Sequence, residues 1–401
     1  MRILAVLAVV FLSLSARAET IKIAFIDPLS GPAAAVTQNG LDHFRFMAAR
    51  LSDSRWQFEV TGFDNKLNPQ ETIVQAQKAV DAGIRILAQG NGSGAAGALA
   101  DFVVKHNERN PDAAVLYLNY AAIDPALTNE KCSPWHFRFD AHAGMKMKAL
   151  ATVLARQKAV KKVYLINQDY SFGRAVRDSA RAMLAAARPD IEIVGDELHP
   201  LAKITDFSPY VAKIRASGAD SVITGNWGSD LALLLKAAGE SGLQAGWYTY
   251  YASGIGSPTA VKQSGLAHRV FAVIEGHPNL PQQGDIEARW RAQHGGSFNV
   301  PRIGLAMEML KAAAVKAGSA EPAAIGRALA GLQQKTPYGG LATMRAADHQ
   351  LLQDLYVASF GPLQGDMRLD EEGTGWGWKS AGMVKAADTA LPTTCVMPAF
   401  R

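Results

Sequence analysis

The chain of 401 residues is poor in side chains that bind metals or cross-link the backbone, with two cysteines and nine histidines. The histidines are scattered, and no cysteine and histidine spacing is typical of a zinc site. His136 and His142 share a short segment, but two histidines at that spacing are seldom a ligand set. These absences argue against a metal centre, and we expect no cofactor.

Long apolar runs and clusters of one charge are also lacking after residue 18. No later segment offers about 18 uninterrupted apolar residues, the length that a membrane-spanning helix needs. The net charge is only +5, with 19% charged residues, and nucleic-acid binding would require clustered Lys and Arg. The densest basic segments, 146–148 and 161–162, are interpreted as solvated helix faces and ends. We therefore expect no nucleic-acid partner.

The N-terminus does contain an apolar run, residues 3–14, which follows the basic Arg2. Small residues stand at Ala16 and Ala18, the two positions that a signal peptidase reads. The run of about 12 residues is too short to span a bilayer comfortably. Residues 1–18 are therefore predicted to be a cleaved signal peptide. No cysteine follows the cleavage site, so we expect a released periplasmic protein without a lipid anchor there.

Cys132 and Cys395 are far apart in the sequence. An oxidising compartment permits a disulfide between them, and such a bond would tie the C-terminal tail to the body of the protein. Two free buried thiols are the alternative.

Short apolar runs alternate with amphipathic stretches along most of the chain. Strands are expected at 21–26, 56–63, 84–88 and 114–118, and again at 163–166, 191–197, 221–224 and 247–250. Strands that alternate with helices of 10 to 15 residues predict parallel sheets covered on both faces. The two series are separated near Asp140. The predicted fold class is therefore α/β, with two doubly wound lobes, and ligands of such sheets bind beyond the carboxyl ends of the strands.

The glycine-rich loop 90–97 follows an expected strand and opens an expected helix. It satisfies the dinucleotide pattern G-x-G-x-x-G formally, but it follows the third strand, and no acidic residue ends the next one. A tight structural turn is a second interpretation. We favour a third, an anion site in which Asn91, Ser93 and free N–H groups of the helix start hold a ligand oxygen group.

The segment after the fourth strand contains Asn119, Tyr120 and Ala121. Its backbone groups are expected to face the same crevice, although an ordinary exit from a strand is the alternative.

Aromatic residues gather after the expected strands of the second lobe, where they are candidates for a wall of the crevice. They are Tyr170, Trp227, Tyr250 and Tyr251. Such a wall can stack on a ligand or surround a cation. Core packing is the competing interpretation for each of them.

Support for catalysis is weak. No G-x-S-x-G motif is present, since Ser93 lies one residue out of register. Asp27 and Asp64 precede turn residues, so turn capping is the simpler role for both. No enzymatic activity is expected.

These features together resemble the branched-chain amino acid, or leucine/isoleucine/valine, type of periplasmic solute-binding proteins of ABC importers. The resemblance runs over nearly the whole mature chain. It rests on 29–32, 64–65 with Pro69, the loop with Ser93, 124–128, 137–138, 170–173 and 206–208. The resemblance implies a type I clamshell with three crossover segments. By analogy, lobe 1 comprises 19–139 plus 274–341, and lobe 2 comprises 140–273 plus 342–401.

The resemblance also implies roles for individual residues. Ser93 and the backbone at Ala121 correspond to the holders of the ligand carboxylate, and Tyr170 and Trp227 correspond to aromatic contacts. Two departures stand out. Ile123 takes the place of a threonine that donates to the amino-acid head, and no acid stands near 251–252 to pair an α-ammonium. A different small molecule from leucine is therefore expected.

The predicted function is capture of a small polar organic solute between the lobes, followed by docking on an inner-membrane ABC permease. Amino-acid-like compounds, aromatic or aliphatic carboxylates, amides and quaternary amines are all considered as solutes. We expect a monomer. The alternatives are a ligand sensor that reports to a receptor or regulator and, with less support, a periplasmic hydrolase.

Overall fold

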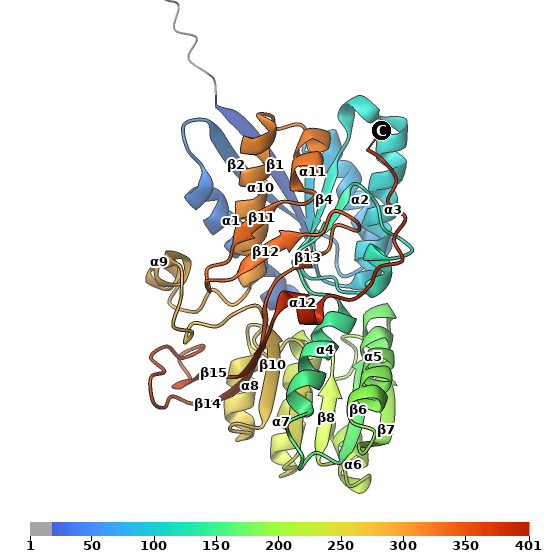
Figure 1. Cartoon of the computed structure of the whole chain (residues 1–401), viewed down its shortest axis with the longest axis vertical. Coiled ribbons are helices and arrows are strands. Elements are labelled where there is room, and N and C mark those ends of the chain that lie inside the picture. The colour runs from blue at the N-terminus through green and yellow to red at the C-terminus, as the bar shows by residue number, and fades with distance from the viewer. Residues whose placement is uncertain (1–17, 401) are drawn as a thin grey trace, which may run out of the picture.

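Two separate β-sheets form the centres of two lobes in the computed structural model, which describes residues 18–400 (Figure 1). The lobe 1 sheet has the order β2-β1-β3-β4-β5, and all its pairings are parallel. The lobe 2 sheet has the order β15-β14-β10-β9-β8-β6-β7, in which the β14–β15 hairpin is an antiparallel addition to a parallel sheet. The predicted α/β class with two parallel central sheets is confirmed.

Lobe 1 is built from both halves of the chain. Its elements are β1 (Glu19–Asp27), α1 (Ala34–Leu51), β2 (Trp56–Asp64), α2 (Pro69–Asp81), β3 (Ile86–Gln89), α3 (Ser93–Arg109), β4 (Leu116–Asn119), β5 (His136–Arg138), α9 (Asp285–His294), α10 (Pro301–Ala317), α11 (Pro322–Leu329), β11 (Gln333–Lys335), β12 (Leu341–Met344) and β13 (Leu351–Leu352). Short 3-10 turns occur at Pro111–Ala113 and Pro125–Thr128.

Lobe 2 takes the middle of the chain and most of its end. Its elements are α4 (Ala143–Leu154), β6 (Lys162–Gln168), α5 (Ser171–Ala187), β7 (Glu192–His199), α6 (Ser208–Ala216), β8 (Ser221–Thr224), α7 (Gly228–Glu240), β9 (Gly246–Thr249), α8 (Ser257–Ser264), β10 (Val270–Ile274), β14 (Leu355–Pro362) and β15 (Trp376–Val384). The short helix α12 (Ala386–Thr389) follows at the junction of the lobes (Figure 1).

Local sequence signals explain where several helices begin. Asn68 precedes α2, and its side chain accepts hydrogen bonds from the amides of Gln70 and Glu71. Pro69 occupies the first position of that helix, where a missing N–H costs nothing. Gly92 precedes α3 with a φ of 86°, a conformation that side chains other than glycine rarely adopt. The loop in front of α3 therefore depends on glycine.

The chain passes between the lobes in the segments 139–142, 275–284 and 353–354, and its C-terminal tail returns to lobe 1 after β15. The hydroxyl of Thr393 donates to the carbonyl oxygen of Thr128 over 2.9 Å, and Cys395 is joined to Cys132 by a disulfide. Phe400 then packs edge-on against Trp135 at 5.0 Å between ring centroids. The tail thus connects the end of lobe 2 to the surface of lobe 1.

A small antiparallel sheet of β11, β12 and β13 also belongs to lobe 1. Ala342, Met344 and Leu351 are buried in the same core as α10. The division expected from the sequence placed 342–401 with lobe 2, whereas the structure puts β12, β13 and the tail against lobe 1. The reason is long-range packing of apolar side chains, which the local sequence pattern does not reveal.

The predicted signal peptide, residues 1–18, lies outside the described residues except for Ala18. Within residues 18–400, none of the helices combines the length and the hydropathy needed to cross a bilayer.

Candidate functional site

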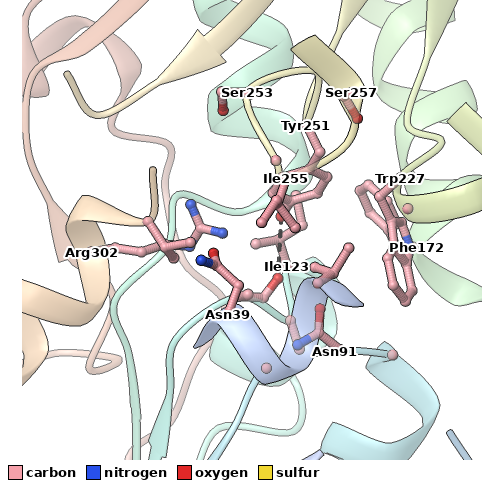
Figure 2. Close-up of a pocket in the computed structure, with 18 of the residues that line it drawn as sticks. Asn39, Asn91, Ile123, Phe172, Trp227, Tyr251, Ser253, Ile255, Ser257 and Arg302 are labelled. Atoms are coloured by element: carbon pink, nitrogen blue, oxygen red, sulfur yellow. Dashed lines mark hydrogen bonds between the residues drawn. The ribbon is translucent and has the colours of Figure 1, made fainter. Parts of the chain in front are cut away.

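A pocket lies between the two lobes, where segments that follow β3 and β4 face segments that follow β6, β8 and β9 (Figure 2). Lobe 1 contributes Val36, Asn39, 90–93, 121–123, Asn299, Val300 and Arg302; lobe 2 contributes Tyr170, Phe172, Trp227, Gly228, Tyr251, Ser253, Gly254, Ile255 and Ser257. This position, beyond the carboxyl ends of parallel strands, is where open α/β sheets place their ligands.

The start of α3 forms one polar end of the pocket. Ser93 is the first residue of the helix and lines the pocket together with Asn91. The N–H groups of a first helical turn have no acceptor within the helix, and they carry the positive end of the helix dipole. The loop fits tightly, because a Cβ atom on Gly90 would lie 2.8 Å from the ring of Tyr120. This end of the pocket can bind an anionic oxygen group.

Asp27, at the end of β1, holds this loop from behind. Its carboxylate accepts hydrogen bonds from the backbone amides of Gly90 at 3.1 Å and Asn91 at 2.9 Å. It also accepts one from the Tyr120 hydroxyl at 2.7 Å, and the same hydroxyl accepts from the Asn91 side chain at 2.6 Å. Tyr120 is therefore a support for the loop and does not line the pocket.

Complete burial raises the pKa of Asp27 to about 7, although the hydrogen bonds from Tyr120, Asn91 and Gly90 act in the opposite direction. A carboxyl group buried without a cation beside it favours its neutral form. The donors that surround Asp27 compensate part of this cost and fix the loop at the same time.

Asn119 has a similar supporting role after β4. Its side-chain oxygen accepts from the amides of Ala121 at 3.2 Å and Ala122 at 2.8 Å, and its amide group donates to the carbonyl of Ala122. Asn119 is fully buried. Ala121 itself lines the pocket, so Asn119 shapes the turn that presents it.

Four aromatic side chains form the lobe 2 wall: Tyr170, Phe172, Trp227 and Tyr251. The rings of Tyr170 and Phe172 lie 5.7 Å apart, and those of Phe172 and Tyr251 lie 6.0 Å apart, both with edge-on geometry. The indole N–H of Trp227 donates to the Tyr170 hydroxyl over 2.9 Å. Tyr250 lies behind this wall, with its hydroxyl donating to the carbonyl of Ala143 over 3.1 Å.

A buried cluster of charges lies beneath Tyr251, where the lobes join. Lys146 pairs with Asp140 at 2.9 Å and with Glu275 at 3.4 Å. Arg302, at the start of α10, pairs with Asp140 at 3.4 Å and with Glu275 at 3.3 Å. The cluster thus combines two cations, one from each lobe, with two carboxylates that come from two of the three crossover segments.

Arg302 is the member of this cluster that reaches the pocket. Its Nε donates to the carbonyl of Tyr120 over 2.7 Å, which places the guanidinium beside Ala121. Figure 2 shows Arg302 and Asn39 on one side of the pocket and Trp227 with Phe172 on the other. Burial raises the pKa of the Glu275 carboxyl group, but the charges of Lys146 and Arg302 outweigh this and lower the pKa below its ordinary value.

The structure brings Asn91, Ser93, Ala121, Tyr170, Trp227 and Tyr251 together at the pocket, and it places Asn119, Tyr120 and Tyr250 behind the lining. Several lining residues were not predicted from the sequence, among them Asn39, Phe172, Ser253, Ile255, Ser257, Asn299 and Arg302. Phe172 stands inside the 170–173 segment and could have been found there. Arg302 opens a helix far from the other segments, and no local pattern marks it.

Acidic side chains are absent from the lining of this pocket, and Arg302 is the charged residue among the described residues that line it. Across residues 18–400, no group of histidine, cysteine, aspartate and glutamate side chains could hold a metal ion. The arrangement is suited to binding a solute with an anionic oxygen group at one end and apolar surface at the other.

Comparisons with known proteins identify the family of this chain. The family model described as periplasmic binding protein matches residues 20–363. The Leu/Ile/Val-binding protein homolog 4 of Brucella melitensis is 32% identical over 384 residues, which cover 90% of this chain and 88% of that protein.

Solved structures show the same fold. The leucine-, isoleucine-, valine-, threonine- and alanine-binding protein of Brucella ovis, in a closed conformation, superposes with a TM-score of 0.81 at 29% identity and covers 95% of this chain and 100% of its own. A solute-binding protein of an R. palustris ABC transporter in complex with 4-hydroxybenzoate gives 0.75 at 19% identity, over 92% and 97% of the two chains. The chain therefore belongs to the periplasmic binding protein family of ABC transporters, in the group of leucine/isoleucine/valine-type proteins with the type I fold.

Proposed function

We propose that this protein captures a small organic carboxylate with an apolar or aromatic body between its lobes, in the periplasm, and delivers it to an inner-membrane ABC permease. The observation that carries the proposal is the composition of the pocket. An amide-rich helix start with Ser93 and the guanidinium of Arg302 face a wall of four aromatic rings, and no acidic side chain is among the lining residues.

The polar end favours an anion for two physical reasons. Free amides at a helix N-terminus point at a bound oxygen group, and the helix dipole favours negative charge there. Charge-assisted hydrogen bonds of this kind contribute about 1.5–3 kcal/mol each. The Asp27 carboxylate already accepts hydrogen bonds from the backbone amides of Gly90 and Asn91. It does not line the pocket, so it does not repel an anionic ligand there at close range.

The same lining disfavours an α-amino acid. An α-ammonium group needs acceptors, and a carboxylate is the strongest of them. Asp140 and Glu275 are paired with Lys146 and Arg302 behind Tyr251, and neither lines the pocket. Burying an ammonium without an acidic partner would lose on the order of 1.5–3 kcal/mol relative to a paired one.

The related protein with 4-hydroxybenzoate supports an aromatic acid as one member of the proposed class. The Brucella relatives, which are leucine/isoleucine/valine-type proteins, support the opposite preference. Because the lining residues decide specificity and the fold does not, we base the choice between these ligands on the pocket.

The experiment is a titration calorimetry panel on the mature protein with benzoate, 4-hydroxybenzoate, a branched aliphatic acid without an amino group, L-leucine and glycine betaine. We expect saturable binding of at least one carboxylate, and affinity for L-leucine at least about 10-fold weaker, corresponding to 1.4 kcal/mol. Tighter binding of L-leucine than of every amine-free carboxylate would overturn the proposed solute class.

A further inference from the structure

The turn of the β14–β15 hairpin contacts two loops that line the pocket, one at Gly256 and one at Ser297, without lining the pocket itself. This turn, residues 363–375, belongs to lobe 2. At its tip stand two consecutive glutamates, Glu371 and Glu372. Neither lines the solute pocket, so the proposed function does not use them directly.

Glu372 holds the lobe 2 loop. Its carboxylate accepts from the amide of Gly256 at 2.5 Å, from the amide of Thr259 at 3.0 Å and from the Thr259 hydroxyl at 2.5 Å. Gly256 lies between the lining residues Ile255 and Ser257. Both carboxylate oxygens are therefore occupied by donors that fix the segment 256–259, which includes the lining residue Ser257.

Glu371 holds the lobe 1 loop. Its carboxyl group accepts from the hydroxyl of Ser297, two residues before the lining residue Asn299. Glu371 is 3% exposed and lines a smaller cavity, behind the solute pocket, that shares Ser253 and Asn299 with it. This hydrogen bond crosses from lobe 2 to lobe 1.

Two further contacts anchor the same turn to lobe 1 and to the crossover. Arg291 of α9 donates to the carbonyl of Asp370 over 3.0 Å. Asn279, in the crossover 275–284, accepts from the amide of Leu369 at 2.9 Å and donates to its carbonyl at 2.7 Å. The turn is therefore fixed relative to the junction of the lobes.

The backbone at Glu372 indicates that its side chain is needed there. Its φ is +55°, a left-handed conformation that costs a residue with a side chain roughly 1–2 kcal/mol. Glycine would fit this position at lower cost, and Gly373 follows directly with a φ of 67°. The three hydrogen bonds of the Glu372 carboxylate compensate this strain.

We propose that Glu371 and Glu372 are positioning residues for solute binding: adjacent carboxyl groups on one turn hold the lobe 1 loop at Ser297 and the lobe 2 loop at Gly256 in fixed relative positions. The effect on affinity rests on the proposed function. The hydrogen bonds of Glu371 to Ser297 and of Glu372 to Gly256 and Thr259, which we call the brace, exist without solute. The proposal predicts that side chains outside the pocket control how well the two lobes fit one ligand.

The first test uses hydrogen exchange on the solute-free protein. Glu372→Gln places an amide N–H₂ group against one of the donors, so one charge-assisted hydrogen bond is lost. The rate of backbone amide exchange in the segment 253–262 should therefore rise roughly 10-fold or more. Glu371→Leu should raise exchange in 295–300, which lies in the other lobe. Glu371→Gln keeps an acceptor for Ser297 and should behave as the wild type, as should the exposed control Glu192→Gln.

The second test measures the affinity for 4-hydroxybenzoate by calorimetry. Glu372→Gln, Glu371→Leu and Ser297→Ala should each weaken binding by roughly 3- to 10-fold, comparable to one lost hydrogen bond. The double variant Glu371→Leu/Ser297→Ala should bind like either single variant, because both changes remove the same contact. Because Glu371→Leu also removes a buried carboxyl group, we expect this variant to be as stable as the wild type or more stable while it binds more weakly. A purely structural role of Glu371 would instead predict weaker binding only together with lower stability.

The two arms separate the brace from the solute. Wild-type exchange in both segments of Glu372→Gln and Glu371→Leu would overturn the brace. Raised exchange with unchanged affinity would overturn the positioning role. If 4-hydroxybenzoate does not bind the wild-type protein, the same variants are measured with the carboxylate of the panel that binds most tightly. If no carboxylate of the panel binds, that result counts against the proposed solute class, and the exchange experiment still decides the brace.

Discussion

The indole Nε1 of Trp227 donates a hydrogen bond to the hydroxyl of Tyr170 over 2.9 Å. The two residues stand at the starts of different helices, α7 and α5, and both line the pocket. The bond fixes the orientation of one aromatic ring by another, so the lobe 2 wall is rigid before a solute arrives. A prearranged surface loses less conformational entropy on binding.

Trp227→Ala is therefore expected to weaken solute binding by roughly 1–3 kcal/mol. Tyr170→Phe should weaken it by about 1 kcal/mol, because the buried indole N–H loses its acceptor while the ring remains. Calorimetry with the tightest carboxylate of the panel measures both effects. Tyr210→Phe, on the far side of lobe 2 and outside the pocket, is the matched control. Unchanged affinity in Trp227→Ala would remove the aromatic wall from the binding surface.

Arg302→Gln should destabilise the protein even without solute. It leaves Asp140 and Glu275 with Lys146 as their one cation partner, and breaking a buried ion pair typically costs about 3–5 kcal/mol. Chemical denaturation measures the loss.

The double variant Arg302→Gln/Glu275→Gln restores the balance of charge, so it should recover part of this stability. Solute affinity should stay low in both variants, since the guanidinium is absent from the pocket. A double variant as unstable as the single one would show that charge balance is not the reason for the cluster.

Removal of the disulfide with Cys132→Ser/Cys395→Ser is expected to lower the free energy of unfolding by roughly 2–4 kcal/mol. The bond closes a loop with a sequence separation of 263 residues, and it secures the tail that carries Thr393 and Phe400. Denaturation with and without reductant measures the effect. The wild-type protein should respond to reductant, whereas the double variant should not. Equal stability of oxidised and reduced wild type would contradict this prediction.

Glu371 makes the stability depend on pH. Burial raises the pKa of its carboxyl group from 4.5 to about 8; Ser297 and Arg291 lower it, while Glu287 and Glu372 raise it. Glu275, His277 and Tyr338 line the same small cavity. In the unfolded chain the group titrates near its ordinary pKa, so between about pH 4.5 and 8 the unfolded state releases this proton first. The contribution of Glu371 to stability therefore falls as the pH rises through this interval.

Glu371→Gln removes that contribution. The difference in unfolding free energy between the variant and the wild type should grow in favour of the variant from pH 5 to pH 8 and level off above. Urea denaturation at each pH measures it, with Glu192→Gln as the control. Parallel pH profiles of wild type and Glu371→Gln would show that Glu371 keeps an ordinary pKa.

The sequence by itself determined the alternation of strands and helices and the location of the loops that meet at the pocket. Short, mostly apolar runs such as Ile86–Gln89 and Leu116–Asn119 are fully buried strands. Gly92 marks the start of the helix after the first of them, and Asn68 marks the start of α2. Ser93, Ala121, Tyr170 and Trp227 could be placed near one crevice because parallel strands present their carboxyl ends at one edge of the sheet.

The tertiary structure alone decided which side chains face the solute and which support it. Tyr120 and Trp227 look alike in the sequence, as aromatic residues that follow strands, but the Tyr120 hydroxyl turns to Asp27 while Trp227 faces the cleft. Arg302 and the Glu371–Glu372 pair also had no local signal, because their partners lie far away along the chain. Local pattern reports burial and secondary structure; the direction of a side chain depends on contacts between distant segments, which exist only after both lobes have folded.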